Sequence, residues 1–279
     1  MNRFRSALLL GTAVAVLVTI GPDLGAQAQQ ELAPAAFISP AYPQGLVSAA
    51  RAERLAWSAY DEGKRNVYTA AAPEFRPVRV TSFMEDDGID LTDVQISADG
   101  SMVAFVRGHN PNRAGWVANP LSDPDGAERA IWAARATGGG GWRVAEGAGY
   151  ELSPDGRWVV FARDGQIYRA STDQNRPASA RDRGEEPFIT AWGTNSNPRW
   201  SPDGSKVAFV SSRTDHSFIG LYDMATRKVT YVAPSVDFDT SPMWTLDSTQ
   251  VVFVRRPGTP FGQQSHAGSG GLGLPAGPA

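Results

Sequence analysis

The hydrophobic residues of this chain recur in a segment that is repeated at long intervals. A Ser-Pro-Asp-Gly turn followed by a short apolar run occurs at 152–161 and again at 200–209. The segment 96–105 keeps the pattern with Ala in place of Pro, 243–253 is a looser copy, and 48–57 is the weakest. Self-similarity at a nearly constant interval is typical of repeat architectures. An aromatic residue marks the register of each copy, at spacings of 48, 56, 48 and 44 residues: Trp57, Phe105, Phe161, Phe209 and Phe253.

Each complete repeat predicts four short β-strands. Pro sets φ early in the turn, Asp bonds to its own backbone and Gly accepts a positive φ. The strand after the turn, for example 207–210, is apolar at consecutive positions, which predicts burial on both faces. A later run such as 228–232 supplies a third strand, and the run before the turn, such as 197–200, supplies the fourth. An aliphatic–aromatic pair marks the second strand: Val67-Tyr68, Ile131-Trp132, Ile167-Tyr168 and Leu221-Tyr222.

These repeats predict an all-β protein, a β-propeller of four-stranded antiparallel blades. A β-sandwich is the alternative, but sandwiches lack a fixed long period. About four and a half blades are present, an incomplete ring, because the fifth repeat ends after its second strand near Arg255. We expect that strand to present an unpaired edge, which is prone to aggregation. Two insertions, 108–125 and 172–186, are predicted to be loops within the second and third blades.

The N-terminal residues have the pattern of a secretory signal peptide. Arg3 and Arg5 precede a fourteen-residue apolar run at 7–20, and Ala26-Gln27-Ala28 provides the small-x-small cleavage pattern. The run is shorter than the roughly 20 residues that a membrane-spanning helix needs, although an uncleaved anchor is the alternative. We therefore predict a periplasmic or secreted protein, exported by a Sec-type signal that is cleaved near Ala28, with no membrane association afterwards.

The chain divides into four predicted segments. A signal peptide occupies 1–28, a linker 29–44, a partial propeller 45–260, and a Gly/Pro-rich tail 261–279, where we expect this chain to be a truncation of a longer protein.

Composition and charge exclude several functions. The 279 residues include no Cys, which excludes a disulfide framework, a thiolate nucleophile and a Cys-based zinc site. Lys and Arg number 26 against 29 Asp and Glu, so there is no basic surface for nucleic acid. The acidic segment 85–90 does not fit the calcium loop of an EF-hand and is predicted to be a solvated loop. No metal or cofactor site is predicted.

The repeats resemble those of two groups of propellers. The pattern Ser-Pro-Asp-Gly-x-x-Val-Ala-Phe resembles TolB-like proteins and the prolyl oligopeptidase family. The segment 213–220 (RTDHSFIG), together with 252–258, is similar to the N-terminal domain of secreted bacterial dipeptidyl-peptidase-IV-like serine peptidases. This resemblance, over about 45–260, implies a propeller that caps an α/β-hydrolase domain and admits short peptides.

The sequence departs from that family in its catalytic part. The family carries its Ser, Asp and His on the hydrolase domain, and the Gly-x-Ser-x-Gly nucleophile motif does not occur in this chain. The nearest segment, 268–270, lacks the first Gly, and Glu185-Glu186 does not match the family's propeller Glu-Glu motif. We therefore expect no catalytic residue here and no peptidase activity from this chain alone.

The resemblance leads to one expected function and one alternative. We expect a non-catalytic propeller fragment of a secreted serine exopeptidase, which gates and orients short peptides for a C-terminal α/β-hydrolase domain that is missing here. The alternative is a stand-alone TolB-like periplasmic propeller that binds a partner protein.

Four residues are candidate contacts for the substrate or for the hydrolase domain. Arg213, Asp215 and His216 share a turn in the fourth repeat, where the expected role of His216 is hydrogen bonding within the turn. Trp116 lies in the second-blade insertion and is the one Trp singled out as a contact, because Trp57, Trp158 and Trp200 occupy repeat positions. A catalytic role is not expected for His109, His216 or His266, since a general base needs a nucleophile and an orienting group nearby.

Overall fold

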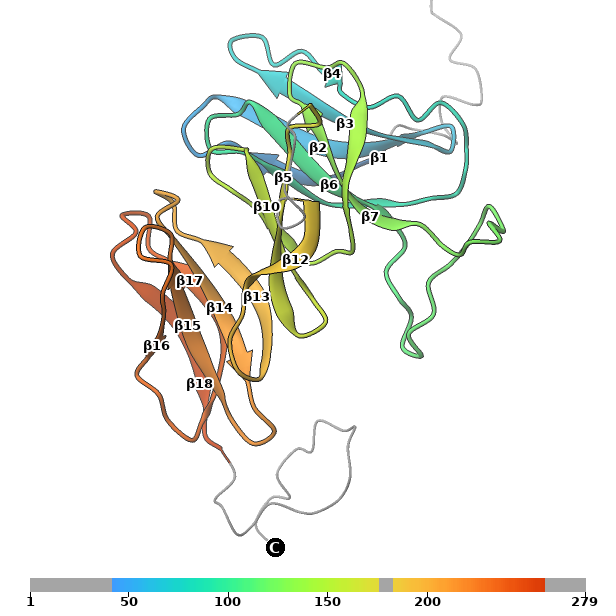
Figure 1. Cartoon of the computed structure of the whole chain (residues 1–279). Helices are drawn as coiled ribbons and strands as arrows, with labels where there is room; N and C mark the ends of the chain where they lie inside the picture. The colour runs from blue at the N-terminus through green and yellow to red at the C-terminus, as the bar shows by residue number, and fades with distance from the viewer. Residues whose placement is uncertain (1–41, 176–182, 259–279) are drawn as a thin grey trace, which may run out of the picture. The chain divides into compact units, whose positions relative to one another are not determined.

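The structure, a computed structural model, describes residues 42–175 and 183–258, which form eighteen β-strands and contain no helix. The predicted signal peptide, most of the linker, the tail and His266 lie outside the described residues. The strands form successive antiparallel sheets in which the strand order follows the chain (Figure 1). Four sheets have four strands each, and a final pair of strands is joined to the fourth sheet by one parallel pairing, Ser217 with Phe238.

Each sheet corresponds to one sequence repeat. The first sheet has β1 (Tyr42–Ser48), β2 (Arg54–Asp61), β3 (Lys64–Ala71) and β4 (Val78–Arg79). The second has β5 (Leu91–Ile96), β6 (Met102–Gly108), β7 (Arg129–Arg135) and β8 (Gly141–Glu146). The third has β9 (Tyr150–Leu152), β10 (Trp158–Arg163), β11 (Gln166–Ser171) and β12 (Arg183–Ile189). The fourth has β13 (Thr194–Trp200), β14 (Lys206–Ser212), β15 (Ser217–Asp223) and β16 (Val229–Val232), and the last pair is β17 (Phe238–Trp244) and β18 (Val251–Arg256).

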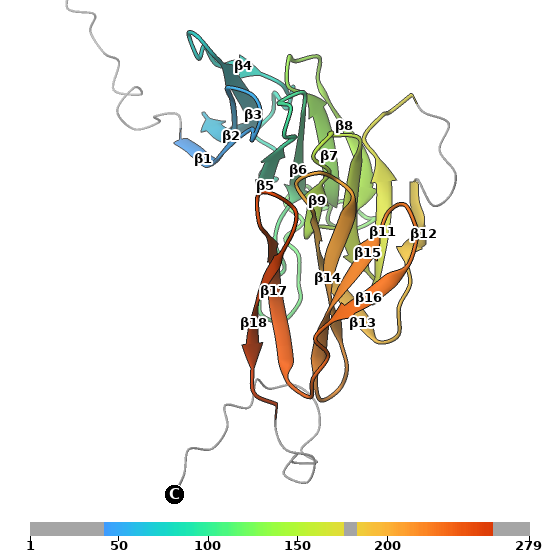
Figure 2. The ribbon, with the colours of Figure 1, turned by 90° about the vertical axis from the view of Figure 1, so that its left-hand side faces the viewer.

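The predicted all-β fold with propeller-type blades is confirmed, including a fifth blade of two strands. Contacts join the first strands of successive sheets, β1 to β5, β5 to β9, β9 to β13 and β13 to β17. These strands therefore form the inner side of the series, as in a propeller. The sheets do not close a ring within the described residues, and Figure 2 shows β1 and β18 in the first and last sheets of the series.

Two boundaries differ from the prediction. The first strand begins at Tyr42, so it includes three residues that were assigned to the linker. In the third blade, residues 183–186 were predicted to be part of a loop but belong to β12. The charged composition of 183–186 misled the prediction, because β12 is an outer strand whose exposed face tolerates charge.

In four of the five repeats, the turn before the second strand is held by the same set of hydrogen bonds. In the fourth sheet, the Ser201 hydroxyl donates to Asp203 Oδ1 (2.6 Å) and accepts from the Lys206 amide (2.9 Å). Asp203 Oδ1 also accepts from the Ser205 amide at 3.0 Å. The turns around Asp99, Asp155 and Asp247 repeat these contacts, with Thr245 in place of Ser in the last. The hydroxyl and the carboxylate thus satisfy backbone amides that the strands leave unpaired.

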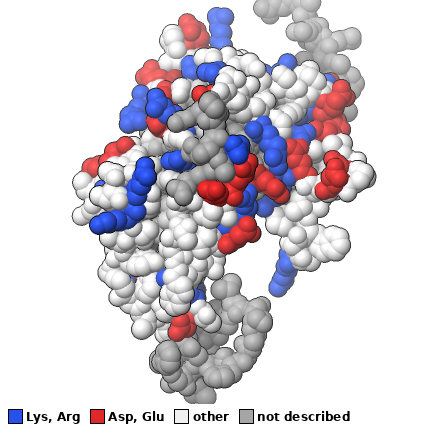
Figure 3. Space-filling view, in the orientation of Figure 1, with Lys and Arg blue, Asp and Glu red and all other residues white. Residues whose placement is uncertain are grey.

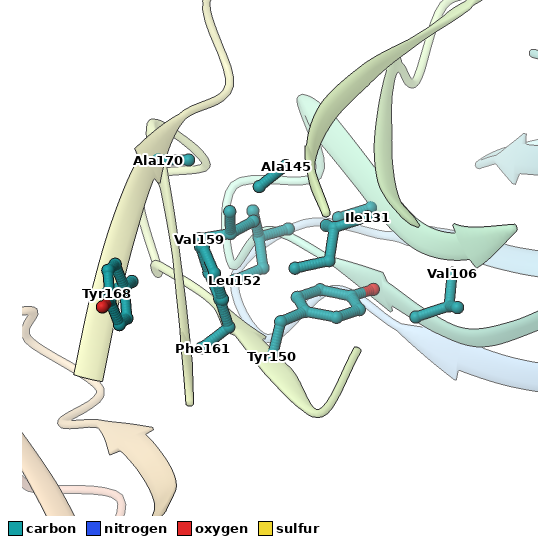
Figure 4. Packing of buried hydrophobic residues seen from close by; sticks show 10 residues of the cluster. Val106, Ile131, Ala145, Tyr150, Leu152, Val159, Phe161, Tyr168 and Ala170 are labelled. Atoms are coloured by element: carbon teal, nitrogen blue, oxygen red, sulfur yellow. The ribbon is translucent and has the colours of Figure 1, made fainter. Parts of the chain in front are cut away.

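In the second, third and fourth blades the strand after the turn is buried on both faces, as predicted. In β10, Val159 and Phe161 pack with Ala104 and Val106 of the preceding sheet (Figure 4). Val160, between them, packs in the opposite direction against residues of the following sheet that include Phe209. Each fully buried side chain of this size contributes on the order of 1.5–3 kcal/mol, so these strands dominate the packing energy.

The tryptophans at repeat positions contribute to packing to different extents. Trp200 is buried in the cluster with Val160 and Phe209, whereas Trp57 and Trp158 are half-buried. Trp158 also lies beneath the Arg169 guanidinium, 3.9 Å from the ring centre.

The repeat position of the marker aromatic allows a matched test of packing. Phe209 is fully buried, whereas Phe253, at the same position of the last blade, is half-buried. We expect Phe209→Ala to lower the free energy of unfolding by about 3–5 kcal/mol and Phe253→Ala by less than half as much. Urea unfolding followed by tryptophan fluorescence measures both. Equal losses would contradict the lower burial of Phe253 relative to Phe209.

The Ser–Asp turn predicts a dependence of stability on pH. The hydrogen bonds from Ser201 and Ser205 lower the pKa of Asp203 to about 2. A carboxylate with a depressed pKa stabilises the fold above its unfolded pKa of about 3.9, and this contribution is lost as the pH falls toward 2. We expect the stability difference between the wild type and Asp203→Asn to be constant from pH 7 to 5 and to shrink from pH 4 to 2. A difference that stays constant down to pH 2 would contradict this account.

Candidate functional site

The four candidate residues lie at the same end of the strands. The turn 213–216 joins β14 to β15, and the insertion with Trp116 joins β6 to β7. Both segments therefore connect the second and third strands of a blade and leave the sheet at the end opposite the Ser–Asp turns. In Figure 1 the insertion between β6 and β7 projects on the right, whereas β14 and β15 lie on the left.

Arg213 is the centre of an aromatic cluster at this end of the fourth blade. Its guanidinium carbon lies 4.6 Å from the ring centre of Trp192, 5.4 Å from that of Phe218 and 6.0 Å from that of Tyr231. Its Nη1 donates to the Ser211 hydroxyl (2.9 Å), which in turn donates to Asn195. The guanidinium is thereby fixed against the rings, while Trp192 remains 79% exposed. A flat aromatic surface over a held cation is suited to contact with another molecule.

Asp215 and His216 adjoin this cluster. His216 Nδ1 lies 2.7 Å from Asp215 Oδ1, and the imidazole ring packs against the edge of Phe218 with 4.8 Å between the ring centres. The backbone amide of Arg213 donates to the His216 carbonyl (2.7 Å), which closes the turn. These contacts agree with the predicted hydrogen-bonding role of His216 in the turn. A contact of these residues with substrate or with another domain stays a prediction.

No interaction among the described residues connects Trp116 with the aromatic cluster around Arg213. It is 75% exposed and lies in a small turn closed by Asn112, whose side-chain oxygen accepts the amides of Ala114 and Trp116. The insertion thus presents Trp116 to solvent at the same end of the strands.

The acidic segment 85–90 is solvated only in its first half, so the predicted solvated loop is corrected. Arg107, at the end of β6, is largely buried and forms ion pairs with Asp87 and Glu128. Its guanidinium also lies over the rings of Phe83 and Trp132. A buried guanidinium requires carboxylate partners, so the packing of Arg107 draws the second half of the segment inward. An arginine that ends a two-sided apolar strand is the sequence signal that was missed.

His109 makes two further contacts with the second half of the 85–90 segment. Its Nδ1 lies 3.0 Å from Asp90 Oδ2 and its Nε2 lies 2.8 Å from the Gly88 carbonyl. Asp90 also accepts a hydrogen bond from the Tyr60 hydroxyl at 3.2 Å. Among the described residues, neither His109 nor His216 faces a serine hydroxyl, and no group of three His, Asp or Glu side chains is arranged to hold a metal ion.

The inner strands contain a second repeated feature that the sequence analysis did not identify. In β1, β5, β13 and β17 a bulge adds one residue opposite the marker aromatic of the neighbouring strand. The bulges of β1 and β5, for example, lie opposite Trp57 and Phe105. Each blade has a residue with positive φ twelve positions before its marker aromatic: Gly45, Asp93, Gly149, Asn197 and Ser241. Gly, Asn and Asp tolerate this conformation best, so their fixed offset was a readable signal.

The bulges of β5 and β13, together with Gly149, face a polar hollow on the inner side of the series. Asp93, Gly149 and Asn197 line a space of about 260 Å³ together with Tyr150 and Arg199. The Tyr150 hydroxyl donates to the Asp93 carbonyl at 2.6 Å, and burial raises the pKa of this hydroxyl. The bulge backbone therefore takes part in bonds between neighbouring sheets as well as within them.

A wider hollow of about 600 Å³ continues toward the Ser–Asp turns. It is lined by residues from all five blades, among them Arg51, Leu152, Trp200 and Leu246. Glu151 borders it and pairs with Arg199 at 2.5 Å. Burial raises the pKa of Glu151, and the Arg199 guanidinium opposes that effect. The two hollows together form what we call the inner groove. Its lining is mixed in polarity, and the Glu151–Arg199 ion pair lies where the two hollows meet.

The outer surface carries no continuous field of one charge on the face seen in Figure 3, where acidic and basic side chains are interspersed. No helix among the described residues has the length and apolar character that a membrane crossing would require.

Comparison with known proteins gives distant similarities. No model of a known family matches the chain. Dipeptidyl-peptidase 5 of Porphyromonas gingivalis is 28% identical over 116 residues, which cover 38% of this chain and 17% of that protein. TolB from Acinetobacter baumannii is 20% identical, covering 76% of this chain and 48% of that one, with a TM-score of 0.48. A prolyl endopeptidase structure is 14% identical, covering 72% and 31%, with a TM-score of 0.49. TolB propellers and prolyl oligopeptidase-type peptidases are thus among the proteins similar to this chain, and they are the two groups that the repeats resemble.

The positive-φ position of the last blade, Ser241, allows a test by substitution, because serine suits a left-handed conformation less well than the Gly, Asn or Asp of the other blades. Ser241 adopts a φ of 55° without being Gly, Asn or Asp. We expect Ser241→Gly to raise the free energy of unfolding by up to about 1 kcal/mol, because the strain relieved exceeds the entropy that glycine loses. Ser241→Val should lower it by about 1 kcal/mol or more, since a β-branched residue disfavours positive φ. Thermal unfolding measures both variants, and effects of the same sign would contradict a left-handed bulge at this position.

Proposed function

We propose that this chain is the propeller portion of an exported serine exopeptidase, in which it gates and orients short peptides for an α/β-hydrolase domain. The observation that carries the proposal is the match to dipeptidyl-peptidase 5. The resemblance of residues 213–220 (RTDHSFIG) to secreted dipeptidyl-peptidase-IV-like peptidases supports it independently. The chain spans 17% of that relative, so the peptidase activity and its substrates belong to the proposal.

The geometry around the histidines supports a non-catalytic role for the described residues. A serine hydrolase needs a serine hydroxyl within hydrogen-bond distance of an imidazole that a carboxylate orients. Within the described parts of the chain, His216 has the carboxylate, Asp215, but contacts no serine hydroxyl, and His109 bonds to a carbonyl and to Asp90. We propose that catalysis resides in the hydrolase domain and that the propeller supplies access and positioning.

Two surfaces have the chemistry for these roles. The cluster of Arg213, Trp192, Phe218 and Tyr231 offers a fixed, partly exposed aromatic surface at the hairpin end of the strands. We propose that it contacts the hydrolase domain. In the inner groove, Asp93 is exposed to the 260 Å³ hollow and would pair with the α-ammonium group of a short peptide.

Export is part of the same proposal. The arginines at 3 and 5, the apolar run 7–20 and the Ala26-Gln27-Ala28 pattern support a cleaved Sec-type signal peptide. An enzyme that acts on short peptides would then act in the periplasm or outside the cell.

The continuation of the reading frame after residue 279 tests the proposal directly. We expect further repeats followed by a Gly-x-Ser-x-Gly motif, and no peptidase activity from the 279-residue chain on dipeptide p-nitroanilides. A stop codon at this position together with a stable monomeric product would overturn the peptidase proposal and favour a stand-alone TolB-like propeller.

In the continued protein, Arg213→Gln should lower kcat/KM about tenfold, because the aromatic surface loses its fixed cation. The matched control is Arg227→Gln, an exposed arginine at the opposite end of the same blade, which should leave kcat/KM unchanged. Both variants are compared at a temperature where each is folded. Unchanged activity in Arg213→Gln would remove this cluster from the proposed interface.

A further inference from the structure

We propose that the hairpin between β10 and β11 is a site of spontaneous covalent modification, at which Asp164 isomerises to isoaspartate through its bond to Gly165. The change needs no enzyme and alters the backbone of the third blade. This inference goes beyond the proposed function and does not depend on it.

The reaction needs only the chain and water. The Gly165 backbone nitrogen attacks Cγ of the protonated Asp164 side chain, a C–N bond forms, and the hydroxyl group leaves with the amide proton as water. Water then opens the succinimide ring that has formed. Opening at Cγ restores aspartate, whereas opening at the backbone carbonyl leaves the chain linked through Cβ, which is isoaspartate. Glycine favours the ring closure because it has no side chain beside the attacking nitrogen.

The described residues contain six Asp-Gly pairs, which the structure separates by two features. One is whether hydrogen bonds hold the carboxylate, and the other is whether the glycine amide already donates to an acceptor. Either restraint keeps the carboxyl carbon away from the nitrogen that has to attack it. The six pairs begin at Asp87, Asp99, Asp125, Asp155, Asp164 and Asp203.

The three pairs in the Ser–Asp turns carry both restraints. The amides of Gly100, Gly156 and Gly204 donate to the carbonyl of the serine three residues earlier, at 2.8–2.9 Å. Each aspartate accepts the hydroxyl of that serine and the backbone amide two residues further on. Isomerisation in these turns would first have to break several hydrogen bonds, each of which stabilises the fold by about 1 kcal/mol.

Two further pairs carry one restraint each. In the insertion of the second blade, the Gly126 amide donates to the Asp123 carbonyl at 3.0 Å. The carboxylate of Asp87 is held by the ion pair with Arg107 and accepts the Ile89 amide at 2.9 Å. The folded chain therefore opposes ring closure at five of the six pairs.

Asp164 is free of both restraints. Its side chain is 80% exposed, and within the described residues its carboxylate has one distant ion pair, 3.7 Å from Arg163 Nε. Both turn residues have positive φ, 49° and 71°, and the Gly165 amide has no acceptor among the described residues. The nearest atoms to the side-chain position of Gly165 belong to Thr194, 3.8 Å away. The carboxyl group can therefore turn toward this amide without breaking a hydrogen bond.

The modification would reach the neighbouring blade. The Gly165 carbonyl accepts the backbone amide of Asn195 at 2.8 Å. Asn195 is buried and accepts from the Ser211 hydroxyl, which itself accepts from Arg213. Isoaspartate adds a carbon to the backbone of a two-residue turn and so displaces the Gly165 carbonyl. We expect the hydrogen bonds between the third and fourth blades to weaken as a result.

The first blade provides a matched control. Its hairpin between β2 and β3 has the same two-residue turn, formed by Glu62 and Gly63 with φ of 49° and 81°. Glutamate carries the same charge as aspartate, but its additional carbon makes the ring larger and its closure much slower. Asp164→Glu should therefore keep the hairpin and abolish isomerisation at this position.

Ageing of the full chain tests the inference. Native protein and protein unfolded in guanidinium chloride are incubated above room temperature until the unfolded chain contains isoaspartate at all six Asp-Gly pairs. Mass spectrometry with electron-transfer fragmentation locates the isoaspartate. We expect the native chain to contain several-fold more at 164 than at any other pair. Asp164→Glu, shown to be folded by circular dichroism, should lose only the signal at 164.

A native chain in which 164 isomerises no faster than the five restrained pairs would overturn the inference. The effect on the fourth blade has its own readout, because ion exchange enriches the isoaspartate form of the aged wild type. We expect this form to have a lower Tm than the unmodified chain, and repair by protein isoaspartate methyltransferase to restore it. An unchanged Tm would overturn the predicted weakening of the contact with Asn195.

Discussion

The structure depends on burial of both faces of the strand that follows each Ser–Asp turn. Because this strand has apolar side chains in both directions, it must lie between two other sheets, and each sheet must therefore have a neighbour on either side. Phe161 and Val160 illustrate the constraint, since they point into clusters shared with the preceding and the following blade. A serial arrangement of sheets follows from this requirement.

At the ends of these strands, neighbouring side chains satisfy backbone amides that the strand pairing leaves unpaired. The Ser201–Asp203 pair and its counterparts perform this task at one end, which explains why the turn sequence is the most regular part of the repeat. On the inner side, the bulges opposite the marker aromatics accommodate a large ring by adding one residue and accepting positive φ. The polar groove is a consequence of this packing solution, because the bulged residues turn away from the core and toward the inner side.

Several arginine side chains form local ion pairs with nearby carboxylates. Arg107 is held by Asp87 and Glu128 where an apolar strand ends, Arg199 by Glu151 at the junction of the inner hollows, and Arg255 by the buried Asp239 in the last blade. Each of these contacts joins different strands or loops, so the ion pairs position loops and blades. Arg213 differs, because within the described residues it contacts aromatic rings, hydroxyls and a carbonyl, and Trp192 of its cluster is exposed.

The sequence by itself determined the all-β fold, the blade period and most strands, including the two described strands of the fifth blade, because these follow from local turn chemistry and from the hydrophobic pattern of single strands. It also indicated the turn around His216. It did not reveal the partners of the 85–90 segment or the extent of β12, since the burial of Arg107 and the outer position of residues 183–186 arise from neighbours distant in sequence. Tertiary structure alone decided that Arg213 lies against Trp192 and Tyr231 and that Trp116 is separate from them. These properties depend on which sheet lies next to which, and local sequence patterns do not encode the distance between side chains on different strands.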